Sequence, residues 1–180
     1  LLRKKFKDRD LLNLLDGRYS IIGGGYENEV KNTAQYGGIF GGRGNEISGN
    51  HTFIGGGLNN KTYKDNSAIL GGVANEARGL GSQVIGIGMI ADSASEIALG
   101  EAGTTYIPAS DTEFNIADRA LNVGIGNFNL DERRDGFSVF KNGTATLPEI
   151  TNNLIEAAPS KVIVTKEYVN RKKQIVLSIE

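Results

Sequence analysis

Few side chains in this sequence are of a type that could carry out acid–base or metal chemistry. His51 is the only histidine and there is no cysteine, which excludes the HExxH zinc motif, two-histidine metal sites and thiolate ligands. A catalytic triad is not expected either. We expect His51 at the surface or in a turn, because it stands beside a short apolar segment. The sequence therefore predicts no metal centre and no cofactor.

Paired carboxylates are the remaining candidates for catalysis. Glu27 with Glu29, and Asp131 with Glu132, lie close in sequence, and a glycosidase needs two such acidic groups. Glu29 belongs to a column of repeat positions that also holds Lys61, so a solvated face is the better interpretation. We therefore predict no catalytic residues and no enzyme activity.

Basic and glycine-rich motifs give equally little indication of a ligand. Arg133 and Arg134 fall in a loop expected over residues 127–136 and could contact an acidic glycan, but a solvated turn explains them better. The string GGRGNE at Gly41–Glu46 resembles a calcium-binding nonapeptide without its period or its aspartates. The formal net charge is −1, and acidic residues outnumber basic ones in the glycine-rich part of the chain. This charge balance excludes a basic stripe that would bind nucleic acid. The ligand-binding residues stay unknown.

The element that positions these side chains is a glycine-punctuated repeat. The chain has 25 glycines and 3 prolines, and most of the glycines lie between Gly17 and Gly103. Apolar pairs run into glycine at intervals of about 15 residues, which is typical of a solenoid. The copies are SIIGGG, GIFGG, TFIGGG, AILGG, QVIGIG and EIALG, with first glycines Gly23, Gly41, Gly55, Gly71, Gly86 and Gly100.

A second short element follows each of the first four copies. It reads NEV, NEI, NKT and NEA, and the segment Asp92–Ala94 (DSA) is a degenerate fifth copy. Interior glycine costs a helix about 1 kcal/mol relative to alanine, so units this short and glycine-rich predict strands. We therefore expect two short strands in each repeat.

Alternation along a strand predicts which faces are buried, because successive side chains point to opposite sides. The first strand is apolar on both faces. One of its columns is Ile22, Phe40, Ile54, Leu70, Ile85 and Leu99, and the other is Ile21, Ile39, Phe53, Ile69, Val84 and Ala98. In the second strand an apolar column stands beside a polar one: Val30, Ile47, Thr62, Ala77 and Ala94 beside Glu29, Glu46, Lys61, Glu76 and Ser93.

A single solenoid has one interior, which takes one column from each strand. The second apolar column of the first strand is then left exposed along the rod, and a continuous exposed apolar stripe marks an interface. Self-association about the rod axis would bury it, although the sequence leaves open which column faces the interior and which faces the axis. The asparagines that start the second strands tolerate left-handed turns and can stack as a hydrogen-bonded ladder: Asn28, Asn45, Asn60 and Asn75.

The repeats at Tyr19–Gly103 resemble the β-roll heads of YadA-like trimeric adhesins and the similar heads of trimeric phage tail fibres. The resemblance implies an all-β fold, a left-handed parallel β-roll of about six repeats, and three chains around one axis. The strings RALNVGIGN, DGFSVFKNGTATLPEIT and SKVIVTKEYVN resemble the connectors that follow heads in tail fibres. We therefore expect a cap at 1–18, a head at 19–103, a connector at 104–170 and the start of a stalk at 171–180.

The two ends carry further structural expectations. Leu1–Leu15 mixes apolar and basic residues, which is compatible with a short amphipathic helix that caps the first repeat. Asn142-Gly143 predicts a type I′ hairpin turn between Phe137–Lys141 and Thr144–Leu147. No apolar run has the roughly 20 residues needed to cross a bilayer, so membrane insertion is not expected.

The resemblance implies a structural and receptor-binding segment of a trimeric tail fibre that attaches a virion to a host cell. Its partners would be two further copies, other fibre or tail subunits, and a host receptor, glycan or protein, of unknown identity. The head of a bacterial cell-surface adhesin is the alternative, and a polysaccharide depolymerase is a third hypothesis.

Overall fold

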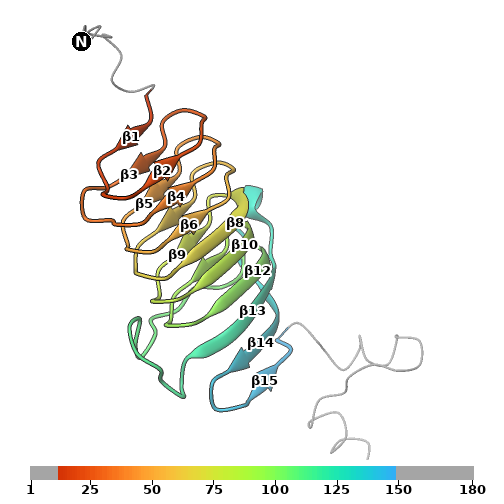
Figure 1. Ribbon diagram of the computed structural model, residues 1–180. Helices are drawn as coiled ribbons and strands as arrows, with labels where there is room; N and C mark the ends of the chain where they lie inside the picture. The colour runs from red at the N-terminus through yellow and green to blue at the C-terminus, as the bar shows by residue number, and fades with distance from the viewer. Residues whose placement is uncertain (1–11, 149–180) are drawn as a thin grey trace, which may run out of the picture.

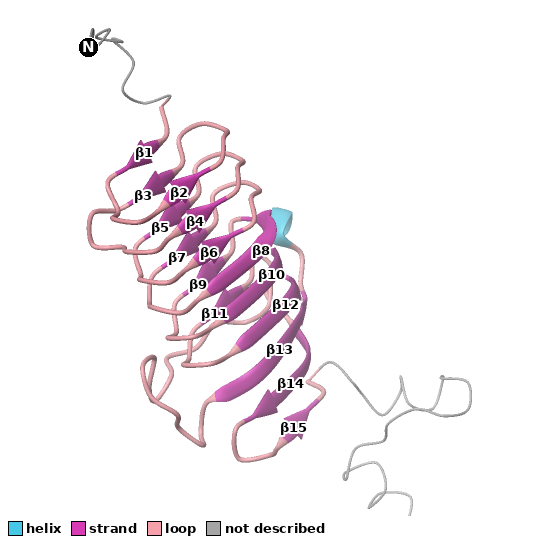
Figure 2. Ribbon diagram, in the orientation of Figure 1, coloured by secondary structure: helices cyan, strands magenta, loops and turns pink. Residues whose placement is uncertain are grey.

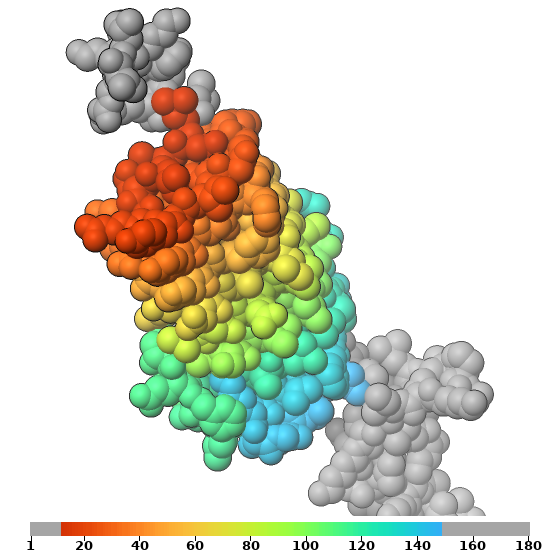
Figure 3. Space-filling model, viewed as in Figure 1, coloured from red at the N-terminus to blue at the C-terminus, as the bar shows by residue number. Residues whose placement is uncertain are grey.

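Short strands alternate between two sheets as the chain advances (Figure 1). The computed structural model describes residues 12–148. About six stacked parallel turns form a β-solenoid, and the described residues hold one short 3-10 helix, η2 (Phe128–Leu130), and no α-helix (Figure 2). The chain advances along the long axis of an elongated body from one end to the other (Figure 3). Strands β14 and β15 form an antiparallel hairpin at the far end (Figure 1).

The strands of the two sheets are short and their order follows the turns. The six-stranded sheet has the order β1 (Leu14–Leu15), β3 (Glu29–Val30), β5 (Glu46–Ile47), β7 (Lys61–Thr62), β9 (Glu76–Ala77), β11 (Ile90–Ala91). The nine-stranded sheet has the order β2 (Ile21–Ile22), β4 (Gly38–Ile39), β6 (Phe53–Ile54), β8 (Ala68–Val73), β10 (Gln83–Ile87), β12 (Ile97–Glu101), β13 (Arg119–Ile125), β14 (Asp135–Phe140), β15 (Ala145–Thr146). Pairing is parallel up to β13 and antiparallel in β13–β14 and β14–β15.

The core is a stack of small apolar layers between the two sheets, with one residue from each sheet per turn. The nine-stranded sheet contributes Ile39, Ile54, Ile69, Val84 and Ala98, and the six-stranded sheet contributes Val30, Ile47, Thr62, Ala77 and Ala91. All of these are at most 1% exposed. Each turn therefore depends on its neighbours for a closed interior, as expected of a solenoid.

The strand register differs from the columns expected from the sequence. Ile22 pairs with Ile39 and Ile54 pairs with Ile69, so the expected columns are wrong by one residue at SIIGGG and TFIGGG. In these two copies the first glycine occupies the outward position that Phe40 and Leu70 fill in others. Ile21 and Phe53 consequently point outward. The glycines that align are the last ones of the first four copies, followed by Gly86, which is the first glycine of QVIGIG.

The fifth copy of the second strand also lies elsewhere than expected. Strand β11, Ile90–Ala91, pairs with Glu76–Ala77, whereas the sequence indicated Asp92–Ala94. Strand β10 lacks one residue relative to β8, because the register shifts between Val84 and Ile85, and after the corner the buried Met89 occupies the place of the ladder asparagine. The interior residue of this turn is therefore Ala91.

Both ends of the described chain differ in part from expectation. Leu14–Leu15 form strand β1 beside β3, where a helix was predicted; residues 1–11 of that segment, like residues 149–180 of the expected connector and stalk, lie outside the described residues. At the other end, Gly143 has φ +85° and its N–H donates to the Phe140 carbonyl (2.9 Å), while Asn142 keeps a negative φ. That is a type I turn followed by a glycine bulge, in place of the type I′ turn.

A column of glycines lines one corner of the solenoid and explains the glycine period. Its members are Gly25, Gly42, Gly57, Gly72, Gly86 and Gly100, all with positive φ. A Cβ on Gly42 would collide with the carbonyl oxygen of Gly57 in the next turn. Neighbouring strands lie only about 4.8 Å apart, so this corner leaves no room for a side chain.

We expect Gly42→Ala to destabilise the fold by about 2–4 kcal/mol, since it combines a left-handed backbone (φ +89°) with that collision. The adjacent Gly41 provides a matched control, because a Cβ there would meet nothing within 4 Å. Denaturant unfolding of both variants at one protein concentration measures the difference. Equal stability of Gly42→Ala and Gly41→Ala would contradict the explanation of the glycine column.

Candidate functional site

The outward side of the nine-stranded sheet, which we call the apolar sheet face, carries exposed apolar side chains. Its side chains belong to the residues directly before and directly after the buried interior residue of each strand. They are Ile21, Phe40, Phe53, Leu70, Ile85, Ile97, Leu99, Leu121, Val123, Phe137 and Val139. Phe40 is 69% exposed and Leu70 60% exposed, although both lie in ordered strands or next to them.

The apolar sheet face is continuous from β2 to β14 and almost free of polar groups. Gln83 is the one polar side chain among the positions that flank the interior column in these strands. Gly23, Gly38 and Gly55 alternate with the large residues, and the rings of Phe40 and Phe53 meet edge to face with centroids 5.4 Å apart. The face is therefore an apolar stripe of ridges and gaps along the whole solenoid.

The outward side of the six-stranded sheet has the opposite character. It carries Glu29, Lys31, Glu46, Lys61, Glu76 and Arg78, among others. Lys31 and Lys61 pair with Glu46 from the turns on either side, and Arg78 pairs with Glu76 at 2.8 Å. A hydrogen bond to the Glu46 carboxylate raises the pKa of Lys31 above its ordinary value of 10.5. This side is suited to water, so only one of the two sheets requires cover.

The asparagines at the starts of the second strands form a buried ladder. Asn28, Asn45, Asn60 and Asn75 are each 0% exposed. The side-chain oxygen of Asn45 accepts hydrogen bonds from the backbone N–H (3.0 Å) and side-chain amide (3.1 Å) of Asn60. The amide of Asn60 donates in turn to the carbonyls of Gly56 and Gly72. Asn13 accepts from Asn28 as the first rung.

The left-handed residues of this corner lie one position before the asparagines, a placement that no sequence pattern indicated. Glu27, Asn59 and Ala74 have φ between 53° and 58°, and Gly44 has φ +64°. The ladder asparagines keep negative φ, which corrects the expectation that they would occupy left-handed turns. Their role in the solenoid is to satisfy backbone groups of the adjacent turns.

A buried ion cluster closes the far end of the solenoid. The Arg119 guanidinium is 4% exposed, and its Nε lies 2.9 Å from Oε1 of Glu96. Its Nη1 lies 3.4 Å from Asp135 and its Nη2 lies 3.8 Å from Asp92. The guanidinium also stacks on the Tyr106 ring, 4.3 Å from the centroid. Removing one partner of such a cluster destabilises the fold by much more than the ion pairs contribute to its stability, because the remaining charge is left buried without a partner.

Hydrogen bonds from the backbone complete this cluster. The N–H groups of Asp92 (2.9 Å) and Ser93 (3.0 Å) donate to Oε2 of Glu96. Burial raises the pKa of Glu96 above its ordinary value of 4.5, and the positive charge of Arg119 opposes that shift. Sequence reasoning missed this site, because it combines Asp92 and Glu96, which stand at the edges of expected repeat copies, with Arg119 and Asp135, which lie beyond the repeats in β13 and β14.

We expect Glu96→Gln to flatten the pH dependence of stability. A carboxyl whose folded-state pKa is raised binds its proton more tightly when folded, so its contribution to the free energy of unfolding is full below pH 4.5. That contribution is lost as the pH rises through the folded-state pKa, and glutamine does not titrate. Denaturant unfolding at a series of pH values from 4 upward measures the effect, with the exposed Glu113→Gln as control. Identical pH slopes in Glu96→Gln and the parent would contradict the assignment.

Neither a protein-family model, nor a curated protein, nor a solved structure matches this chain. The geometry of the described residues, and the apolar sheet face above all, is therefore the basis for the proposed function.

The other side chains that the sequence offered as candidates for catalysis or ligand binding do not form a common site in the structure. Glu27 pairs with Arg43 at 2.8 Å, and the exposed His51 ring stacks on Tyr36 with centroids 4.9 Å apart. Arg133 donates to the carbonyls of Gly88 (2.9 Å) and Gly103 (3.0 Å). Each of these residues therefore has a local contact within the solenoid or at its corner.

The other residues considered for chemistry, Asp131, Glu132 and Arg134, are exposed around helix η2 and strand β14. Within residues 12–148 no group of three or more acidic, histidine or cysteine side chains is placed to hold a metal ion. Over the same range no helix is long and apolar enough to span a membrane.

Proposed function

We propose that this chain is a structural, non-enzymatic segment of an extracellular fibre in which three parallel copies bury their apolar sheet faces against one another. The apolar sheet face is the observation that carries the proposal. Soluble monomers rarely expose contiguous apolar patches beyond a few hundred Å², and this one follows the whole described solenoid. Strands apolar on both faces are typical of sheets covered on both sides.

A further copy of the same chain fits this face better than an unrelated protein. The ridges and gaps of the face recur once per turn, because each turn contributes one flanking position before and one after the interior residue. A parallel copy related by rotation about an axis along the solenoid presents the same period at the same height. Closed rotational symmetry of this kind is usual for homo-oligomers, and it would bury the face over its full length.

The number of copies and the biological setting rest on the resemblance to trimeric heads. That resemblance supports three chains, a left-handed coil, and a place in a phage tail fibre that attaches a virion to its host. A trimer also presents three copies of every exposed loop, so weak contacts with a repetitive cell surface gain avidity. The charged outward side of the six-stranded sheet would then form the outside of the fibre.

Electron microscopy with a gold-labelled antibody against this chain tests the proposed setting. We expect label on fibres that project from virion tails. Label on the surface of bacterial cells would replace the tail fibre by a cell-surface adhesin, and label confined to the cell interior would contradict the proposal. New reducing ends after incubation with host polysaccharide would contradict the absence of catalysis.

A further inference from the structure

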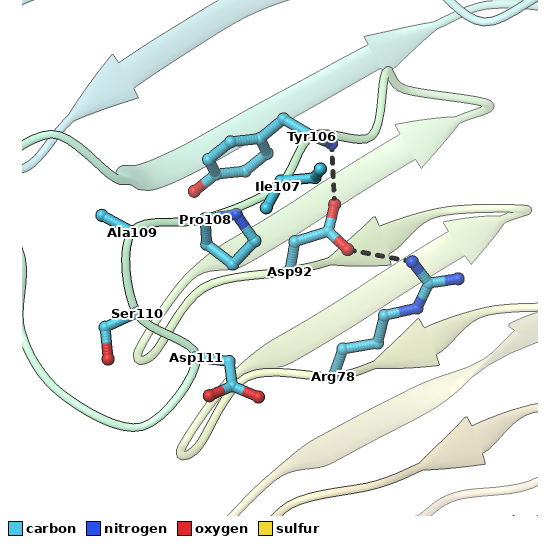
Figure 4. A pocket seen from close by; sticks show the side chains of 8 residues that line it. All are labelled: Arg78, Asp92, Tyr106, Ile107, Pro108, Ala109, Ser110 and Asp111. Carbon is cyan, nitrogen blue, oxygen red and sulfur yellow. Dashed lines mark hydrogen bonds and ion pairs between the residues drawn. The ribbon is translucent and has the colours of Figure 1, made fainter.

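The described chain has a pocket where the end of the six-stranded sheet meets the loop 104–118. Its volume is about 480 Å³, and its walls are Arg78, Asp92, Tyr106, Ile107, Pro108, Ala109, Ser110 and Asp111 (Figure 4). Pockets of roughly 300–1,000 Å³ are the usual size for small ligands. Arg78 and Asp92 directly follow β9 and β11, so the pocket lies on the charged sheet, away from the apolar sheet face.

Hydrogen bonds hold the loop against the solenoid and form the pocket in advance of any ligand. The N–H groups of Ala109 (2.7 Å) and Ser110 (3.0 Å) donate to the Asp118 carboxylate. The Leu80 N–H donates to the Asp111 carbonyl at 2.7 Å. A site that is already formed costs a ligand less ordering free energy on binding.

Positive and negative side chains around the pocket are paired with one another, and this pairing favours a neutral ligand over an anion or a cation. The Arg78 guanidinium pairs with Glu76 (2.8 Å) and Asp92 (3.1 Å), and Asp111 pairs with Lys64 at 3.2 Å. A phosphate or an acidic sugar would meet the carboxylates of Asp92 and Asp111, and a cation would meet Arg78. A neutral ligand avoids both penalties.

The polar and apolar groups of the pocket match the two faces of a sugar ring. The planar guanidinium of Arg78, the Asp111 carboxylate and the Ser110 hydroxyl offer donors and acceptors suited to hydroxyl groups. Beside them, Pro108 and Ile107 form an apolar wall that suits the C–H face of a pyranose. Ile107 is 96% exposed, so its side chain is accessible to a ligand in the pocket.

We propose that this pocket binds a neutral sugar unit of a surface glycan. The inference deepens the proposed function, on which it rests for its biological meaning, by naming the class of receptor and the residues that contact it. Because the proposed trimer leaves the charged sheet in water, all three copies of the pocket stay open to a multivalent glycan.

Saturation-transfer NMR on the full chain tests the pocket directly. The probes are the methyl α-glycosides of glucose, galactose and mannose, with N-acetylneuraminic acid as the acidic comparison. We expect transfer to at least one neutral glycoside and none to the acid. Arg78→Lys, which keeps the charge but loses the planar fork, should raise the dissociation constant about tenfold. Ile107→Ala should raise it about threefold, and Ile116→Ala, exposed on the same loop but outside the pocket, should leave it unchanged.

Three outcomes would overturn the inference: no transfer to any neutral glycoside, preference for the acid, or equal affinities for Ile107→Ala and Ile116→Ala. Unfolding midpoints of the variants show whether a loss of binding reflects a loss of fold. The oligomeric state is measured on the same samples. A trimer without sugar binding would overturn only the pocket inference, whereas a monomer that binds sugar would overturn only the proposed assembly.

Discussion

Leu70→Asp combined with Ile85→Asp is expected to separate the assembly into single chains. Both residues project from the apolar sheet face in consecutive turns, 60% and 43% exposed in the isolated chain. Each substitution would place a carboxylate in the proposed interface, where an unpaired buried charge costs several kcal/mol. Rotational symmetry repeats the cost in every copy. Size-exclusion chromatography with light scattering should show the mass falling from three times 19.2 kDa to 19.2 kDa.

Ile116→Asp is the matched control for this experiment. Ile116 is 63% exposed, but it lies on the loop 104–118 and not on the sheet. The same change of an exposed isoleucine to aspartate should therefore leave the mass at three chains. Far-UV circular dichroism distinguishes a folded single chain from an unfolded one. An unchanged mass for the Leu70/Ile85 double variant would place the interface elsewhere.

Asn60→Ala is expected to cost about 3–5 kcal/mol of folding free energy, because several buried groups lose their partners at once. The Asn60 oxygen accepts from the backbone N–H and amide of Asn75, both at 3.1 Å. Its amide donates to Asn45 and to two glycine carbonyls. Alanine would leave the Asn75 N–H without an acceptor in a site that is 0% exposed.

The neighbouring Asn59 is the control for the ladder. Asn59 is exposed and left-handed, with φ +56°, so Asn59→Gly keeps the backbone conformation and removes no rung. We expect its stability to stay within about 0.5 kcal/mol of the parent. Denaturant unfolding at one fixed protein concentration compares the variants, since oligomer stability depends on concentration. An Asn60→Ala cost as small as that of Asn59→Gly would show that the ladder contributes little.

The parallel solenoid could be predicted from the sequence because its signal recurs in every turn. Short apolar pairs ending in glycine, each followed by a second short element, exclude long helices and require two strands per repeat. The two-sided apolarity of the first strand likewise pointed to an outward apolar surface. These features depend on residue type alone and tolerate loops of different length.

The register could not be predicted, because glycine plays two structural roles in the same string. In SIIGGG the first glycine fills an outward strand position, and the last fills the crowded corner. Aligning first glycines therefore shifted Ile21 and Phe53 into the wrong column. Only the stacking of Gly25, Gly42 and Gly57 on one another resolves the ambiguity, and that stacking is a property of neighbouring turns.

The buried cluster around Arg119 was beyond sequence reasoning for a different reason. Its residues Arg119 and Asp135 lie far along the chain from Asp92 and Glu96, and each of the acidic partners resembles an ordinary surface charge. The cluster stands where the asparagine ladder and the aliphatic layers end, at the last turns of the solenoid. It therefore supplies the buried polar contacts that join the repeats to the β14–β15 hairpin.

Sedimentation equilibrium of the purified full chain tests the assembly through the apolar sheet face most directly. Measured over a range of micromolar concentrations, the mass should correspond to three chains of 19.2 kDa each, without a detectable population of single chains. A stable, monodisperse monomer of 19.2 kDa would contradict the account, because the apolar sheet face would then be exposed to water in the folded protein.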